Sequence, residues 1–239
     1  MPGSIRAQRL ILSSCTALVL VATPAAAFPP YRTTDADTAG AGMLEFRLGL
    51  LKIQTRGSTS ERRTPLTRTN IGIGAHYEII SEFEYSPDEH RLEEGTLGFK
   101  WARLNNGFGV GVETLALLPV NSTLSGAGIE SQFLATFQQE RWQVHINAGG
   151  FYDPRAEQTE KGWRASVLAE FPRERFRPGV ELFAKDARSE AARVQTGIGV
   201  IMEFERFEVR TGIHFGLSDA APDVEASVWF AWKWRVSGE

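Results

Sequence analysis

Polar side chains that could act together in catalysis lie close to one another in the middle of the chain. His145 and Asn147 are two residues apart, and Ser166 is the nearby serine that could act with them. A serine hydrolase needs its serine beside a histidine whose ring is oriented by a polar group. On the strand register derived below, Ser166 points inward, where bilayer lipid could not reach it. We therefore predict a protein that is not an enzyme, with no catalytic residue. An outer-membrane lipid-modifying hydrolase stays open as an alternative.

Metal and phosphate chemistry find little support in the residue spacing. The four histidines show neither an H-E-x-x-H arrangement nor any other metal-ligand spacing, and no glycine-rich phosphate loop follows a strand and opens a helix. Asp35 and Asp37 could bind a cation, but Asp in a turn-rich stretch is common. We predict no metal site and no cofactor.

Selection of a solute by charge is the remaining chemistry that the pattern offers. Charged residues occupy one side of many alternating segments, and six of them are predicted to line a lumen: Glu82, Glu84, Lys100, Glu113, Glu181 and Arg210. They could form a selective solute path. The alternative is that they only pair with one another to satisfy a low-dielectric interior.

The elements that must position these charges are best seen between residues 194 and 215. Apolar residues from Val194 to Phe204 alternate with polar or small ones, and the alternation resumes from Phe207 to Phe215. Period two indicates strands, and Glu205-Arg206 leaves room for only a tight turn, so the pair is an antiparallel hairpin. Each arm has about ten residues, the length of a tilted strand that crosses a bilayer.

The same unit recurs along the chain. Twelve strands are predicted, at about 43–53, 67–75, 78–86, 94–103, 108–118, 127–138, 142–151, 163–171, 179–187, 194–204, 207–215 and 224–235. The connections alternate between long and short. An even strand count with long loops at one end and short turns at the other is typical of outer-membrane barrels. We predict an all-β fold, a single antiparallel up-and-down transmembrane β-barrel over 43–239. A soluble periplasmic β-sandwich that binds a ligand is the alternative.

Two details favour an apolar face that points to lipid and a charged face that lines a lumen. Aromatic residues gather near segment ends, as interfacial girdles require: Trp101, Trp142, Trp163, Phe171, Phe204, Phe207, Trp232 and Trp234. The charged face also holds many glycines, which suit an interior that is crowded by long side chains or left open.

The N-terminal residues predict export. A basic start, an apolar run from Leu10 to Val21 and an A-x-A site ending at Ala27 indicate a signal peptide over 1–27, followed by an extended lead-in over 28–42. Cys15, the single cysteine, would leave with the signal, so the mature chain would have no disulfide. Loss of Arg6 and Arg9 with the signal would leave 24 Lys and Arg against 29 Asp and Glu, and this mild acidity argues against nucleic acid as a partner.

Two short stretches resemble a known family. Tyr31 to Thr38, followed by Gly42 and the strand from Leu44 to Gly49, resembles the start of the outer-membrane proteins grouped as "MetA-pathway of phenol degradation". The stretch from Gly216 to Asp223 is similar to that family's last loop. The resemblance implies an outer-membrane channel that takes up small organic compounds, and it supplies no catalytic residues.

Together these observations predict a passive channel or transporter for small solutes, aromatic or otherwise organic. It would reach the outer membrane after export and signal cleavage. The expected partners are outer-membrane lipid, a small-molecule solute and the barrel-assembly machinery, with no nucleic acid.

Overall fold

The chain folds into a closed sheet of twelve strands. The computed structural model describes residues 29–155, 159–187 and 191–236, so the predicted signal peptide and Cys15 lie outside the described residues. The strands are β1 (Met43–Gln54), β2 (Glu61–Gly72), β3 (Tyr77–Ser86), β4 (Arg91–Asn105), β5 (Phe108–Leu117), β6 (Gly128–Gln138), β7 (Gln143–Asp153), β8 (Glu160–Glu170), β9 (Phe176–Ala187), β10 (Arg193–Glu203), β11 (Glu208–Gly216) and β12 (Val224–Arg235).

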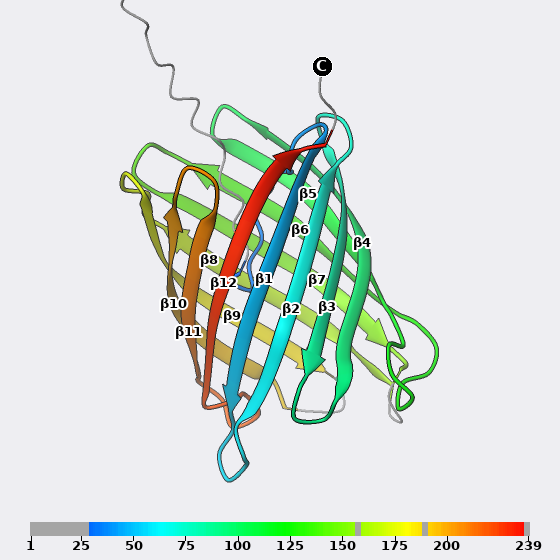
Figure 1. Ribbon diagram of the computed structural model, residues 1–239. Helices are drawn as coiled ribbons and strands as arrows, with labels where there is room; N and C mark the ends of the chain where they lie inside the picture. The colour runs from blue at the N-terminus through cyan, green and yellow to red at the C-terminus, as the bar shows by residue number, and fades with distance from the viewer. Residues whose placement is uncertain (1–28, 156–158, 188–190, 237–239) are drawn as a thin grey trace, which may run out of the picture.

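Each strand pairs antiparallel with its neighbours in the sequence, and β1 pairs with β12 to close the ring (Figure 1). The predicted twelve-stranded up-and-down barrel is confirmed. The alternative β-sandwich is wrong, because closure joins the two edge strands that a sandwich would leave open.

The hairpin of β10 and β11 shows how local pattern makes this sheet. Ile198 lies opposite Ile213, and the ladder runs without a bulge to Glu203 opposite Glu208. The turn is closed by Phe204, whose backbone N–H donates to the carbonyl oxygen of Phe207 at 2.9 Å. The two rings stack with centroids 4.8 Å apart on the outside of the barrel.

β2 starts earlier than the sequence predicted. The second strand is predicted to begin at about residue 67, but β2 begins at Glu61, and Ile53 of β1 lies opposite that residue. The register shifts between Gly49 and Leu51, where one residue of β1, Leu50, spans the same interval as two residues of β2, Thr64 and Pro65. The prediction was wrong because this part of β2 is polar on both faces, so it shows no contrast between apolar and polar positions.

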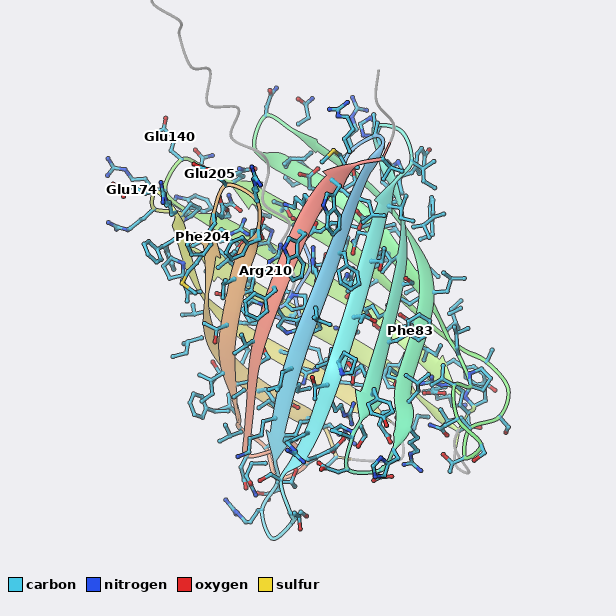
Figure 2. The ribbon with its side chains drawn as sticks, in the orientation of Figure 1. Phe83, Glu140, Glu174, Phe204, Glu205 and Arg210 are labelled. Carbon is cyan, nitrogen blue, oxygen red and sulfur yellow. The ribbon has the colours of Figure 1, made fainter. Side chains whose placement is uncertain are left out.

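The outer face of the barrel is apolar. Large hydrophobic side chains alternate outward along the strands, and Phe133 in the middle of β6 is 73% exposed. Figure 2 shows Phe83 and Phe204 on the outside of the wall. Exposure of so large an apolar surface to water is unfavourable, whereas contact with the hydrocarbon of a bilayer is not. The protein is therefore a transmembrane barrel of the outer membrane. Among the described residues, no helix is long and apolar enough to span a membrane.

The inner face carries the charges. Arg47, Arg68, Lys100 and Arg210 are among the largest fully buried side chains. They alternate with outward apolar residues, so the predicted assignment of the two faces is confirmed. A ring of polar side chains inside and apolar side chains outside is the arrangement of a membrane barrel and the reverse of a soluble one.

The two ends of the barrel differ. The start of β1 and the end of β12 lie at the same end, together with the turns that carry Glu140, Glu174 and Glu205 (Figures 1 and 2). The connection at 118–127 between β5 and β6 lies at the other end. Outer-membrane barrels keep their short turns in the periplasm, so we assign the end where β1 starts and β12 ends as periplasmic and the other end as extracellular.

A charge placed on the outer face should be costly in proportion to its depth. We expect Phe133→Arg, in the middle of β6, to lower the free energy of unfolding by about 2–4 kcal/mol. Ile73→Arg, just beyond the periplasmic end of β2, should cost only about 0–1 kcal/mol. Urea unfolding in phospholipid vesicles measures both. Equal costs at the two positions would contradict the lipid-facing assignment.

Candidate solute path and its internal segment

The lumen holds a piece of the chain itself. Residues 29–42, named here the internal segment, run inside the barrel before β1 begins, as the blue trace in Figure 1 shows. Tyr31, Thr33, Thr34, Asp35 and Ala36 are all buried there. The sequence predicted an extended lead-in over 28–42, and its place within the lumen was not foreseen.

Glycines of the wall make room for this segment. A Cβ atom built on Gly212 would lie 2.7 Å from Cβ of Pro30, and one on Gly199 would lie 2.9 Å from Cγ of Pro30 and 3.0 Å from the ring of Tyr31. Side chains at these two positions would therefore displace the segment. The stripe of glycines on the charged face, visible in the sequence, is explained in part by this close approach.

Glu181 of β9 is the main anchor of the internal segment. Its Oε1 accepts hydrogen bonds from the backbone N–H of Arg32 at 2.9 Å and from the N–H and Oγ1 of Thr33 at 2.6 and 2.5 Å. Its Oε2 lies 2.7 Å from Nε2 of His214. Hydrogen bonds to a buried carboxylate are among the stronger ones in proteins, so this residue fixes the segment at Arg32 and Thr33.

Further anchors follow the segment around the wall. Asn147 of β7 exchanges two hydrogen bonds with the backbone of Thr34, accepting at 2.7 Å and donating at 2.8 Å. The N–H of Ala36 donates to Oγ1 of Thr136 at 2.8 Å, and that of Ala39 to Glu78 at 2.8 Å.

Asp35 of the internal segment forms a buried ion pair. The Nζ atom of Lys100 lies 3.0 Å from its carboxylate, and both side chains are buried. The sequence suggested that this aspartate could bind a cation. In the structure its positive partner is the ammonium group of Lys100 on β4.

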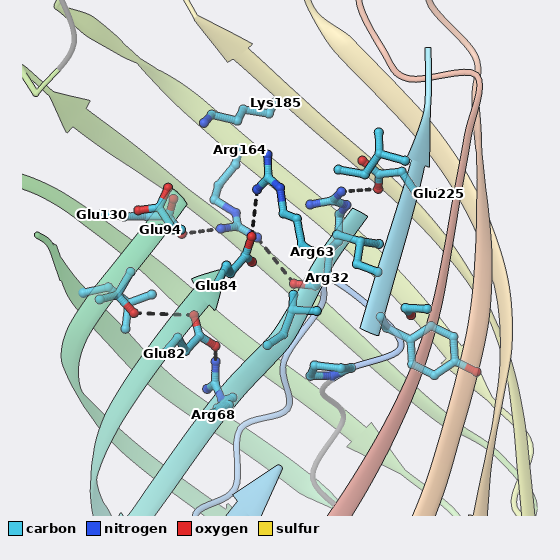
Figure 3. Close-up of a pocket in the computed structure, with 18 of the residues that line it drawn as sticks. Arg32, Arg63, Arg68, Glu82, Glu84, Glu94, Glu130, Arg164, Lys185 and Glu225 are labelled. Atoms are coloured by element: carbon cyan, nitrogen blue, oxygen red, sulfur yellow. Dashed lines mark hydrogen bonds and ion pairs between the residues drawn. The ribbon is translucent and has the colours of Figure 1, made fainter. Parts of the chain in front are cut away.

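On the extracellular side of the internal segment lies a cavity of about 640 Å³ (Figure 3). On β1 it is lined by Leu51 and Ile53 but not by Glu45 or Arg47, which lie nearer the periplasm. Pro29, Pro30, Tyr31 and Arg32 of the segment also line it. The cavity is thus a vestibule open toward the loops, with the internal segment as part of its floor.

The vestibule carries charges of both signs, and most of them are paired. Arg63 contacts Glu84 at 2.7 Å, and Arg155 contacts Glu94 at 2.7 Å. Three further ion pairs of the vestibule are Arg32 with Glu225, Arg68 with Glu82 and Arg164 with Glu130, shown in Figure 3.

Near the periplasmic end the inner face of the wall carries a denser group of charged side chains, named here the periplasmic cluster. Its members are Glu45, Arg47, Glu208, Arg210 and Lys233. Glu45 is 2.7 Å from Nε of Arg47 and 3.0 Å from Arg210, and Glu208 contacts Arg210 at 2.5 Å and Lys233 at 3.2 Å. Removing one partner of such a buried group leaves an uncompensated charge and is costly.

The six residues predicted to line the lumen fall into three places. Glu82, Glu84 and Glu113 line the vestibule. Lys100 and Glu181 hold the internal segment, and Arg210 belongs to the periplasmic cluster. Their role in solute selection stays a prediction. The anchors Asn147 and Thr136 were not among the predicted site residues, because nothing in the sequence says which strand the internal segment touches.

The hydrolase alternative gains no support from the surroundings of His145. Its Nδ1 lies 2.9 Å from Oγ1 of Thr136 and its Nε2 lies 3.1 Å from Glu170. These three side chains and Ser166 are buried inside the lumen, where membrane lipid has no access. The ring is held by lumen residues on both sides, which is the pattern of a structural histidine.

Solved structures of outer-membrane channels and porins have a fold similar to that of this barrel. No family model matches the chain, and no curated protein matches its sequence. Among solved structures, an outer-membrane channel from Pseudomonas putida F1 is similar, with a TM-score of 0.65 and 9% identity over 84% of this chain and 98% of that one. This chain has the fold of outer-membrane channels.

Two porins of known structure are similar as well. The KdgM porin, solved in complex with disordered oligogalacturonate, has a TM-score of 0.58 and 8% identity over 82% of this chain and 99% of that one. The NanC porin has a TM-score of 0.56 and 11% identity over 79% of this chain and 97% of that one. At such identities the likeness concerns the fold alone.

Proposed function

We propose that this protein is an outer-membrane channel for small organic solutes, and that the internal segment closes it in the state described here. The observation that carries the proposal is a polar vestibule, open to the outside, whose floor is a segment of chain held by hydrogen bonds and ion pairs. A solute that enters from outside meets Pro29 to Arg32 before it can reach the periplasmic end. Passive diffusion would follow displacement of the segment.

The size and lining of the vestibule support a small organic solute. A volume of about 640 Å³ falls in the range of small-molecule sites. Leu115, Leu117, Phe151 and Trp229 lie among its charged residues and offer apolar contact. The resemblance of residues 31–38 to the "MetA-pathway of phenol degradation" proteins supports membership of that family, with aromatic compounds among the solutes. Insertion by the barrel-assembly machinery is part of the same proposal.

Conductance of the purified protein in planar lipid bilayers tests the proposed channel. We expect brief openings of the intact protein, since the internal segment is held by non-covalent contacts alone. Absence of any step above background, both in the intact protein and after removal of the internal segment, would overturn the proposal.

A disulfide between the internal segment and the barrel wall should lock the channel shut. A Cβ atom built on Gly109 lies 3.1 Å from Cβ of Ala36. This is slightly shorter than the roughly 3.5–4.5 Å between the Cβ atoms of a disulfide, so a shift of a few tenths of an ångström would allow the bond to form. We expect the double variant Ala36→Cys with Gly109→Cys to lose its openings under oxidising conditions and to regain them with a reductant. Each single variant serves as a control. Persistent openings of the fully cross-linked protein would contradict a role for the internal segment in closure.

A further inference from the structure

Three cations stand side by side on one wall of the vestibule. Arg164 of β8 lies directly opposite Lys185 of β9, and Lys185 lies directly opposite Arg193 of β10. All three line the cavity. Like charges directly opposite one another on neighbouring strands destabilise a sheet. The barrel therefore maintains an unfavourable arrangement at this point of the wall.

Within the described part of the chain, the middle cation of the row has no acidic partner. Arg164 pairs with Glu130, but among the described residues no carboxylate lies within 4.0 Å of Nζ of Lys185. In Figure 3 no dashed line reaches this side chain. Its Nζ lies 4.3 Å from the ring centroid of Phe151, which also lines the cavity. Lys185 thus presents an unpaired positive charge beside an aromatic face.

We propose that Lys185, flanked by Arg164 and Arg193, forms a binding subsite for a small organic acid with one carboxylate. One anionic group would relieve the repulsion within the row and would satisfy the ammonium group of Lys185. The ring of Phe151 receives the apolar part of the solute, together with Leu115 and Leu117, which line the same cavity. This inference rests on the proposed channel and names the class of solute that it admits.

The charge of the ligand is limited by the other residues of the vestibule. Glu82, Glu84 and Glu94 line the same cavity, and Glu84 lies directly opposite Glu94 on β3 and β4. These carboxylates would repel an anion of higher charge more strongly than a monovalent one. The vestibule therefore favours a monocarboxylate over phosphate.

Direct binding to the intact protein in detergent tests the subsite, with benzoate as the probe. Isothermal titration should show that benzoate binds more tightly than benzamide, its neutral analogue, and more tightly than inorganic phosphate. We expect Lys185→Gln to weaken benzoate binding by about tenfold or more. The matched control is Lys161→Gln, which removes a lysine from the outer face of the neighbouring strand β8 and should leave binding unchanged.

The same variants give a second readout that does not depend on titration heats. Without ligand, Lys185→Gln should unfold at a higher urea concentration than the intact protein, because the middle of three like charges is gone. Benzoate should raise the urea midpoint of the intact protein but not that of the variant. Equal binding of benzoate and benzamide, equal binding of phosphate, or unchanged binding by Lys185→Gln would overturn the subsite.

The binding assay also separates this inference from the proposed channel. Benzoate binding in a protein that gives no conductance would refute the channel and support the subsite. Conductance in a protein that binds no benzoate would refute the subsite and support the channel.

Discussion

Deletion of Tyr31 to Ala39 is expected to turn a protein with brief openings into one that conducts continuously, with a conductance several-fold larger. These residues occupy the lumen between the vestibule and the periplasmic cluster, and no strand includes them. A twelve-stranded barrel is wider than the eight-stranded barrels that side chains alone can fill, so its lumen should open once the segment is gone. Single-channel recording in planar bilayers measures both the conductance and the open fraction.

The deletion also has a cost that can be measured separately. Glu181, Asn147 and Lys100 would lose hydrogen-bond or ion-pair partners that the internal segment supplies. We expect a lower urea midpoint together with a retained barrel, seen as heat-modifiable mobility on gels. An unchanged conductance in a correctly folded deletion variant would show that the internal segment does not close the channel.

Glu181→Ala should open the channel without removing any of the segment. The substitution leaves the N–H groups of Arg32 and Thr33 and the hydroxyl of Thr33 without their acceptor in the closed state. Each unsatisfied buried donor costs about 1–3 kcal/mol, so the closed state should lose about 3 kcal/mol or more. That loss corresponds to a rise of about a hundredfold in the ratio of open to closed channels.

Two variants show whether this effect comes from the anchor. Glu181→Gln retains an acceptor oxygen for Thr33 and should raise the open fraction less than Glu181→Ala. Glu203→Ala removes a carboxylate from the periplasmic end of β10, where the described residues show no hydrogen bond to the internal segment, and should leave the open fraction unchanged. Similar open fractions in all three variants would rule out Glu181 as the anchor.

The strands and their faces were determined by the sequence alone. In the hairpin of β10 and β11, apolar and polar residues alternate, and the alternation predicted both the pairing and the side that faces lipid. Period-two alternation is a local property, because successive side chains of a strand point to opposite faces whatever lies elsewhere in the fold. Twelve such segments, joined by connections that alternate between long and short, leave few options besides a closed barrel. The start of β2 was not predicted, because its polar residues do not alternate with apolar ones.

The roles of the charged residues were decided only by the tertiary structure. Glu82 and Glu181 show the same pattern in the sequence, each an acid on the inner side of a strand. Glu82 lines the vestibule, while Glu181 holds a stretch of chain that is 148 residues away at Thr33. Such long-range contacts depend on how the closed ring places β9 beside the internal segment. A periodic pattern does not say which residues meet across the lumen, so the internal segment beside the vestibule was seen only in the structure.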